Sequence, residues 1–244
     1  MDGAVTFDFH DTLARCDEWF ELEVRHLVSA FLRWRADEQA APVDEKLLAA
    51  ANAAYRDLRQ AIVADGRERT AEDCVGEVLR RLGIPVEEPI VARGVEELMQ
   101  RTLEDTRPID GAVETVRALR EANVRLGIVS SAVYHPFLEW TLAKFGLRDA
   151  FADVTTSASA GYYKSRPEIY RHALAALEAA PQRSVHVGDS YRYDVGGARG
   201  AGMRTVWLRP DEDRTPEGEP PDLILATLTG SAPRILGVLR APTA

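Results

Sequence analysis

Residues 4–13 read AVTFDFHDTL, and this stretch decides the fold. Its apolar start, residues 4–7, predicts a buried β-strand that ends at Asp8. Residues 10–12, which follow almost at once, are all polar. Open α/β sheets bind ligands in the crevice at the carboxyl ends of their strands, so Asp8 is a candidate reactive group.

The next part of the chain has the apolar spacing of amphipathic helices. Apolar residues recur at three- and four-residue intervals up to about Thr106, and Pro42, Gly66 and Gly83 interrupt the pattern. The predicted helices cover residues 17–36, 43–64, 70–82 and 88–104. The spacing therefore predicts an all-helical insertion after the first strand.

Beyond Pro108, strands alternate with helices. The predicted strands cover residues 124–129, 153–156, 184–187, 205–208 and 222–225, and the predicted helices cover residues 111–122, 134–145, 166–179 and 193–201. Such alternation implies parallel strands joined by right-handed crossovers. We therefore expect an α/β fold, with a three-layer Rossmann-like core and a parallel sheet from residues 1–14 and 108–244. Residues 15–107 would form the helical domain.

Composition narrows the range of functions. The 244 residues carry a formal net charge of −9, which argues against general binding to nucleic acids or anionic membranes. No apolar stretch reaches the length of about 20 residues that a membrane span needs. Two cysteines, Cys16 and Cys74, argue against a disulfide framework and favour a reducing, cytoplasmic location. A small anionic substrate fits, because a pocket can be positive in an acidic protein.

Polar groups gather where the predicted parallel strands end. Asp8, Ser130 and Asp189 follow three strands, and Lys164 lies in a loop before a helix. A carboxylate can accept a phosphoryl group covalently, and two aspartates can hold Mg²⁺. An ammonium group and hydroxyls, such as those of Thr12 and Ser130, can bind phosphate oxygens. The set predicts phosphoryl transfer, whose anionic transition state needs neutralisation and positioning.

These motifs resemble those of the haloacid dehalogenase-like hydrolase superfamily. Residues 8–13 resemble its first motif, usually Asp-x-Asp-Gly-Thr-Leu, and residues 128–131 its second, a strand ending in Ser or Thr. Lys164 begins a run like the third motif, and residues 187–194 resemble the fourth. A helical cap between the first two motifs is typical of the subclass that includes phosphoglycolate and sugar-phosphate phosphatases.

The resemblance implies a role for each matching residue. Asp8 would be the nucleophile that forms an aspartyl-phosphate, and Lys164 would neutralise charge on it. The implied phosphate-binding residues are Thr12, Ser130 and Ser131. The implied ligands of Mg²⁺ are Asp8, the main-chain carbonyl of His10, Asp189 and Asp194, with orientation of Lys164 as the alternative role of Asp194.

His10 departs from the family pattern, because it stands where phosphatases usually carry a second aspartate. That aspartate protonates the leaving oxygen and later activates water. An imidazole can do both. The alternative is that His10 only fills the position and leaves a slow enzyme, or one that stops at the aspartyl-phosphate.

The leading interpretation is a magnesium-dependent phosphomonoester hydrolase that acts on a small phosphorylated metabolite. The alternatives are a phosphoaspartate switch and a catalytically degenerate binding protein. Two other chemistries of the superfamily fit less well. Dehalogenases usually lack the acid found here as Asp189, and phosphonate hydrolysis needs a cap lysine, for which Lys46 is the only candidate.

Several further residues have a plainer interpretation as structural groups. We expect the histidines outside the first motif to lie in the core or on the surface, although His135 could reach the pocket. The aromatic residues of the cap are expected in its core (Trp19, Phe20, Phe31, Trp34 and Tyr55). Four arginines are expected on a solvated face, with binding of a second acid group of the substrate as the alternative (Arg56, Arg59, Arg67 and Arg69). Four tyrosines beside the third and fourth motifs could line the pocket rim (Tyr162, Tyr163, Tyr191 and Tyr193).

Overall fold

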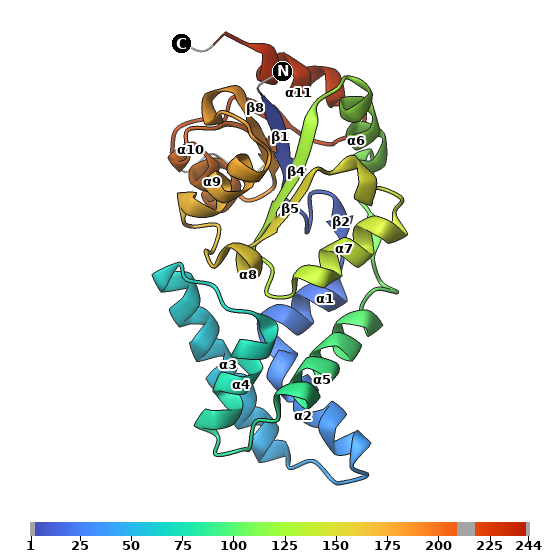
Figure 1. Ribbon diagram of the computed structural model, residues 1–244, viewed down its shortest axis with the longest axis vertical. Coiled ribbons are helices and arrows are strands. Elements are labelled where there is room, and N and C mark those ends of the chain that lie inside the picture. The colour runs from blue at the N-terminus through green and yellow to red at the C-terminus, as the bar shows by residue number, and fades with distance from the viewer. Residues whose placement is uncertain (1–2, 209–217, 243–244) are drawn as a thin grey trace.

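A computed structural model describes residues 3–208 and 218–242 of the protein. Six strands form one sheet in the order β5-β4-β1-β6-β7-β8, and every neighbouring pair is parallel (Figure 1). The strands are β1 (Ala4–Phe7), β4 (Arg125–Ser130), β5 (Asp153–Thr156), β6 (Val185–Gly188), β7 (Arg204–Leu208) and β8 (Leu223–Leu225). The predicted α/β class and parallel sheet are confirmed.

The strand register explains why the polar groups converge. On the central strand β1, Phe7 lies opposite Ile128 of β4 and Val187 of β6. All four residues of β1 are buried, as expected for a strand with neighbours on both sides and helices on both faces. The residues that end these three strands therefore reach the same edge of the sheet, and Asp8 lies at its centre.

Helices cover both faces of the sheet, which makes three layers. Figure 1 shows α9 and α10 on one side of the sheet and α6, α7 and α11 on the other. The helices of this part are α6 (Ala112–Glu121), α7 (His135–Lys144), α8 (Ser157–Ala160), α9 (Pro167–Ala176), the π-helix η4 (Tyr191–Gly197), α10 (Ala198–Gly200) and α11 (Ala232–Arg240), with short 3-10 turns η2 (Arg148–Ala150) and η3 (Pro181–Arg183).

The other helices form the helical insert, at the end of the core where the strands terminate (Figure 1). They are α1 (Asp17–Glu21), the π-helix η1 (Leu22–His26), α2 (Leu27–Glu38), α3 (Glu45–Asp65), α4 (Ala71–Arg81) and α5 (Glu88–Arg101). Two short antiparallel strands, β2 (Ala14–Arg15) and β3 (Arg107–Pro108), join its entry and exit. The exact domain boundaries, 15 and 107, stay a prediction.

Local sequence signals account for the helix ends. The Asp44 side chain accepts a hydrogen bond from Lys46 N at 2.9 Å, and that of Thr70 accepts one from Asp73 N at 3.1 Å, so both are N-caps. Helix α3 ends at Gly66, whose φ of 73° suits glycine. These boundaries match the predicted ones closely.

Besides short elements such as β2, β3 and α8, which were not predicted, three features differ from the prediction. The helix expected over residues 17–36 is interrupted by η1, and the one expected over 193–201 begins as η4. π-Helical turns are rare and concentrate at functional sites, and residue spacing does not distinguish them from α-helix. Helix α11 was not predicted, because its nine residues follow a short loop and contain Pro233 and Gly237.

The helical insert also contacts the core between α3 and α4. Glu68 N donates to the Gly161 carbonyl, Tyr163 N to the Gly66 carbonyl, and Ala71 N to the Val133 carbonyl, at 2.9–3.1 Å. This second connection places the insert over the strand ends.

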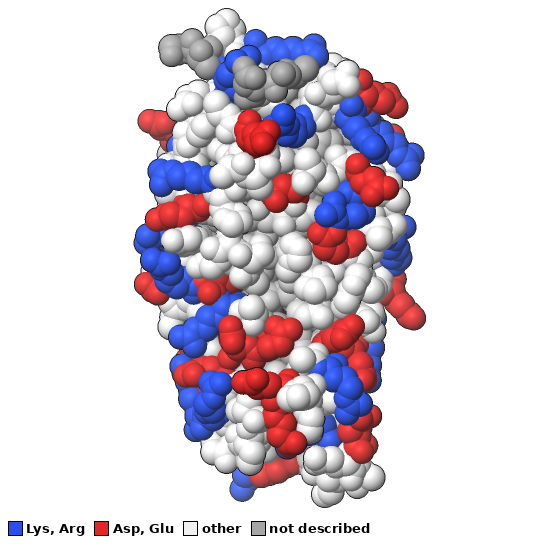
Figure 2. Space-filling model, in the orientation of Figure 1, with Lys and Arg blue, Asp and Glu red and all other residues white. Residues whose placement is uncertain are grey.

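Among the described residues, no helix is both long and apolar enough to span a membrane. On the face in Figure 2, basic and acidic side chains are interspersed.

Candidate active site

A cavity of about 330 Å³ lies between the strand ends and the helical insert. Its core wall includes Asp8, His10, Ser130, Ser131, Lys164, Asp189 and Asp194, and the insert contributes Trp19, Phe20, Glu23 and Arg59. The structure thus brings together seven of the eight residues that the sequence analysis assigned to the site. The eighth, Thr12, does not line this cavity; it is fully buried, and its hydroxyl has no partner among the described residues.

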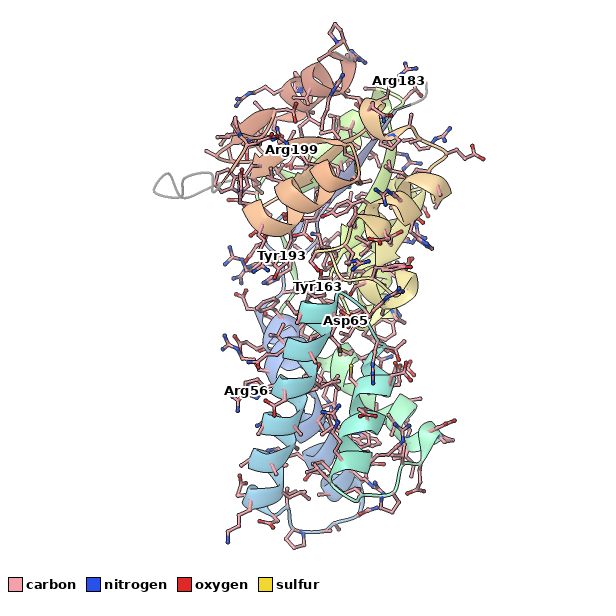
Figure 3. The ribbon with its side chains drawn as sticks, turned by 90° about the vertical axis from the view of Figure 1, so that its left-hand side faces the viewer. Arg56, Asp65, Tyr163, Arg183, Tyr193 and Arg199 are labelled. Atoms are coloured by element: carbon pink, nitrogen blue, oxygen red, sulfur yellow. The ribbon has the colours of Figure 1, made fainter. Side chains whose placement is uncertain are left out.

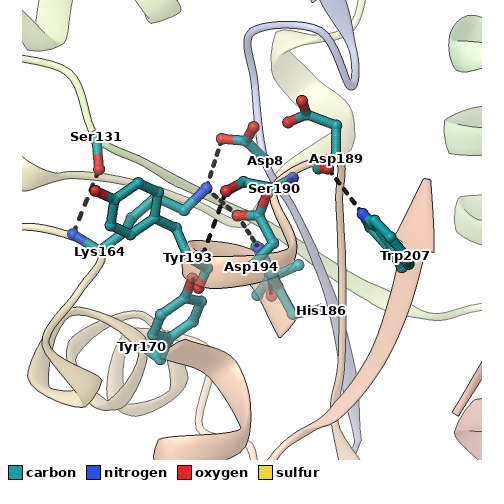
Figure 4. A network of polar contacts seen from close by, with 11 residues as sticks. Asp8, Ser131, Lys164, Tyr170, His186, Asp189, Ser190, Tyr193, Asp194 and Trp207 are labelled. Atoms are coloured by element: carbon teal, nitrogen blue, oxygen red, sulfur yellow. Dashed lines mark hydrogen bonds and ion pairs between the residues drawn. The ribbon is translucent and has the colours of Figure 1, made fainter. Parts of the chain in front are cut away.

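Lys164 connects two of the acids. Its Nζ donates to Asp8 Oδ1 at 2.7 Å and forms an ion pair with Asp194 Oδ1 (Figure 4). All three side chains are buried. Asp194 Oδ2 also accepts from Ser190 N at 2.8 Å, so both of its oxygens have partners within the protein. A buried charge cluster of this kind requires such pairing.

Two glycines allow this close approach. A Cβ on Gly197 would lie 2.5 Å from the Lys164 carbonyl oxygen, and a Cβ on Gly188 would lie 2.2 Å from Asp194 Cγ. Neither space admits a side chain. The small residues of the fourth motif therefore bring the segment that carries Lys164 and the π-helix that carries Asp194 into contact.

The electrostatics of the cluster follow from burial and from like charge. Burial is the largest contribution that raises the pKa of Asp8 above its ordinary value, and the Asp194 charge adds to it, against the opposing effect of Lys164. Burial would lower the pKa of Lys164, but Asp194 and Asp8 outweigh it and raise that pKa well above its usual value. Burial opposes ionisation of Asp194 too, yet Lys164 and His186 hold its pKa below the usual range. An anionic Asp194 and a cationic Lys164 result.

Asp189 completes a group of carboxylates. Oxygens of Asp8, Asp189 and Asp194 all lie within 4.8 Å of one another. Burial, together with the charges of Asp8 and Asp194, raises the pKa of Asp189 to about 8. One lysine does not balance three acids. Hard carboxylate oxygens in excess over cations fit a divalent ion such as Mg²⁺, so the donor set is compatible with the expected metal.

His186 was expected to be a core or surface residue, and the structure places it in the core, in contact with the acid cluster. It is fully buried on β6. Its Nε2 lies 3.2 Å from Asp194 Oδ1 and its Nδ1 lies 2.8 Å from Thr6 Oγ1. Because a carboxylate only accepts, Nε2 is the donor and the Thr6 hydroxyl donates to Nδ1. In the sequence, this contact is indicated only by the position of His186 within an apolar strand, because a buried imidazole needs a hydrogen-bond partner.

His10 lies at the junction of the core and the insert. Its Nδ1 is 3.1 Å from Cys16 Sγ, its Nε2 is 3.5 Å from Asp11 Oδ2, and its ring stacks on Phe20 at 4.5 Å between centroids. Burial raises the pKa of the Cys16 thiol well above its usual value, so its sulfur is not a thiolate, and the sulfur can accept a hydrogen bond from a proton on Nδ1 of His10. The cavity surface includes His10 beside Asp8.

The hydroxyls of the second motif have distinct positions. Ser130 is the last residue of β4 and is buried at the cavity wall. Ser131 Oγ accepts from Lys164 N at 3.3 Å, which links this motif to the lysine loop (Figure 4). His135 does not line the cavity; its Nδ1 is 3.3 Å from Thr156 Oγ1.

Comparison with known proteins agrees with this geometry. A family model described as haloacid dehalogenase-like hydrolase matches residues 3–202. The chain belongs to the haloacid dehalogenase-like hydrolase family. The resemblance of the four motifs is thereby confirmed, and the protein is a hydrolase.

One relative and two solved structures are among the proteins that the chain resembles. A glyceraldehyde 3-phosphate phosphatase from Pyrococcus abyssi is 29% identical over 210 residues, which are 86% of this chain and 82% of that protein. The crystal structure of a HAD phosphatase from Thermococcus onnurineus has a TM-score of 0.64 and 23% identity, covering 98% of this chain and 100% of the other. A 2-haloacid dehalogenase from Pseudomonas syringae has a TM-score of 0.71 and 22% identity, covering 97% and 99%. At these identities the two structures show the shared fold alone.

Two predictions about side chains of the insert, those for Arg59 and Phe20, are wrong. Arg59 is not on a solvated face: it is buried, and its Nη1 donates to Glu68 Oε1 at 2.6 Å. Phe20 is not in the cap core, because 38% of it is exposed and it stacks on His10. The burial of Trp19 is confirmed, although the residue also lines the cavity. Tyr163 and Tyr193 line the cavity as expected, whereas Tyr162 and Tyr191 do not.

Glu23 was not anticipated. It lies on η1, lines the cavity and is buried, and its Oε2 has no hydrogen-bond partner among the described residues. Burial raises the pKa of Glu23 to about 8, although Arg59 opposes the effect. The active-site chamber is thus bounded by a carboxyl group that the folded protein keeps protonated at neutral pH.

Proposed function

We propose that the protein is a magnesium-dependent phosphomonoester hydrolase that acts on a small phosphorylated metabolite through an aspartyl-phosphate on Asp8. The observation that carries the proposal is the contact of Lys164 Nζ with Asp8 at 2.7 Å inside a group of three acids, of which Asp8 and Asp194 are buried. That arrangement suits the capture of an anionic phosphoryl group by a carboxylate. The name of the Pyrococcus abyssi relative supports a phosphatase.

In the first step, an Asp8 carboxylate oxygen attacks phosphorus, and the bond from phosphorus to the leaving oxygen breaks. Lys164 faces Asp8 and balances the charge that develops on the transferring group. Ser130 and Ser131 at the cavity wall are the proposed hydroxyl contacts to its oxygens. His10 gives its proton to the departing alkoxide, which leaves as an alcohol.

In the second step, water attacks the phosphorus of the aspartyl-phosphate. His10, now neutral, takes a proton from that water. The bond between phosphorus and the Asp8 oxygen breaks, which releases inorganic phosphate and restores the carboxylate. A proton that stays on Nδ1, in the hydrogen bond to Cys16 Sγ, leaves Nε2 as the nitrogen of His10 that gives up and takes back the exchanged proton.

The proposed ligands of Mg²⁺ are Asp8, the main-chain carbonyl of His10, Asp189 and Asp194. When bound, the ion would neutralise charge on the transferring phosphoryl group. Because both oxygens of Asp194 have partners within the protein, the geometry favours its alternative role, the orientation of Lys164. A cytoplasmic location remains a prediction from the cysteine content.

The proposal is tested by hydrolysis of p-nitrophenyl phosphate and a panel of metabolite phosphates, with and without Mg²⁺. We expect turnover that requires the ion and that Asp8→Asn abolishes. No turnover on any substrate would contradict the proposal. A stable acyl-phosphate trapped on Asp8 without turnover would instead favour a phosphoaspartate switch, and failure to bind Mg²⁺ or vanadate would favour a degenerate binding protein.

A further inference from the structure

A second cavity, of about 740 Å³, adjoins the active-site chamber. The two cavities share Val24, Arg59 and Tyr163 as lining residues. Helix α3 and η1 of the insert form one wall, and the segments that carry the third and fourth motifs form the other. Figure 3 shows Tyr163 and Tyr193 where the core meets the end of α3, with Arg56 farther along that helix.

The lining of this second cavity is strongly cationic, although the whole chain has a formal charge of −9. It includes five arginines (Arg25, Arg56, Arg59, Arg166 and Arg192) and a single acid, Asp65. Both the insert and the core contribute, so the charges face one another across the boundary. Like charges gathered in this way repel, which makes the cavity a favourable place for an anion.

Internal ion pairs account for only part of this charge. Arg59 pairs with buried Glu68 at 2.6 Å, Arg25 with Glu21 at 3.0 Å, and Arg166 with Glu168 at 2.9 Å. Arg56 and Arg192 have no acidic partner among the described residues. The Arg192 guanidinium lies over the Tyr193 ring, 5.4 Å from its centroid, which positions it without neutralising it.

We infer that this cavity binds a second anionic group, a phosphate or a carboxylate, carried by the leaving-group end of the substrate. The inference rests on the proposed function. Arg56 and Arg192 would hold the group from opposite sides, because a guanidinium offers a planar fork of donors that matches both anions. The substrate class is therefore a phosphomonoester with two separated negative ends.

The two ends of such a substrate would be sorted by charge. The reacting phosphate would lie against Lys164 and the acid cluster, and the second anion would lie among the arginines. Glu23, Tyr163 and Tyr193 line the chamber between, and they suit the uncharged middle of the molecule. A substrate with a neutral tail would leave the guanidiniums of Arg56 and Arg192 without a partner.

The experiment compares three six-carbon phosphate esters. Glucose 6-phosphate has a neutral tail, 6-phosphogluconate has a carboxylate, and fructose 1,6-bisphosphate has a second phosphate. For the wild type, kcat/KM should be higher for at least one of the two doubly anionic substrates than for glucose 6-phosphate. That ratio should fall about tenfold in Arg56→Ala and in Arg192→Ala, mostly through KM, because each loses a charge-assisted hydrogen bond. Arg120→Ala, an exposed arginine on α6 outside both cavities, is the matched control and should keep the ratio.

Because the ratio is taken within one preparation, partial misfolding of a variant cancels. If the arginine variants lose more of the preference for fructose 1,6-bisphosphate, the site binds phosphate; if they lose more of the preference for 6-phosphogluconate, it binds carboxylate. If the wild type hydrolyses glucose 6-phosphate and p-nitrophenyl phosphate but shows no preference for a second anion, or if both arginine variants keep the preference, the inference is wrong. If the wild type hydrolyses none of these esters, the proposed function itself fails, and the inference falls with it.

Discussion

Lys164 Nζ lies 2.7 Å from Asp8 Oδ1 and pairs at the same time with Asp194, so one buried ammonium group serves two carboxylates, one directly after strand β1 and one on the π-helix η4. The pair joins the first and third motifs, which are 156 residues apart in the chain. Loss of the Lys164 ammonium group and loss of the Asp8 charge have different consequences for the cluster. Without Lys164, Asp8 and Asp194 lose the ammonium group that pairs with both; without the Asp8 charge, the cluster loses one of its mutually repelling groups.

We therefore predict opposite stability effects for two inactive variants. Asp8→Asn should lower kcat by about 10⁴-fold or more while keeping or raising the free energy of unfolding, since burial already disfavours the Asp8 charge. Lys164→Met should also be inactive but less stable by about 3–5 kcal/mol, the usual cost of breaking a buried pair. Urea unfolding at pH 7 measures both, and Lys46→Met, an exposed lysine of the insert, is the control. Equal destabilisation by both variants would contradict the assigned charges.

Metal removal gives the second prediction. EDTA should abolish hydrolysis and added Mg²⁺ should restore it; at about 100 times the dissociation constant the ion should also stabilise the fold by about 2.7 kcal/mol. Asp189→Asn should lose this stabilisation yet be at least as stable as the wild type without metal, because its carboxylate is crowded by Asp8 and Asp194. Asp17→Asn, which alters an exposed acid near His10 and Asp11 and outside the group of three acids, should retain the response to Mg²⁺. A stabilising effect that persists in Asp189→Asn would place the ion elsewhere.

The role of His10 predicts a dependence on the leaving group. An alkyl alcohol needs a proton as it departs, whereas p-nitrophenolate leaves without one. His10→Ala should therefore slow formation of the aspartyl-phosphate from an alkyl phosphate by about 10²–10⁴-fold, and by much less from p-nitrophenyl phosphate. Single-turnover kinetics separate this step from hydrolysis of the intermediate. His10→Asp, which restores the family's residue, is the matched variant and should retain activity on both esters. An alanine variant that matches the wild type would rule out acid and base roles for His10.

Sequence alone predicted the fold and the core side of the site because both depend on local patterns. Each strand has its own apolar run, and a parallel sheet takes the end of each run to one edge, so the sequence pattern alone predicts that Asp8, Ser130 and Asp189 lie together. The other contacts depend on packing between distant segments. Nothing near Arg59 in the sequence shows that Glu68 folds back to bury it, and nothing near His186 shows that Asp194 accepts its hydrogen bond. The same holds for the stacking of Phe20 on His10.

Glu23 predicts an unusual pH dependence of stability. Burial raises its pKa from an ordinary 4.5 to about 8, so between these values the folded protein holds a proton that the unfolded chain has released. Raising the pH in this window must favour unfolding, with a slope that approaches about 1.4 kcal/mol per pH unit for one proton. Glu23→Gln, which keeps the shape and cannot ionise, should therefore gain stability over the wild type steadily from pH 5 to pH 7.5. Urea unfolding of both proteins in EDTA across this range measures the difference, in which the titration of the shared acid cluster cancels. A difference that stays constant with pH would mean that Glu23 ionises normally and that the chamber beside Asp8 carries another negative charge.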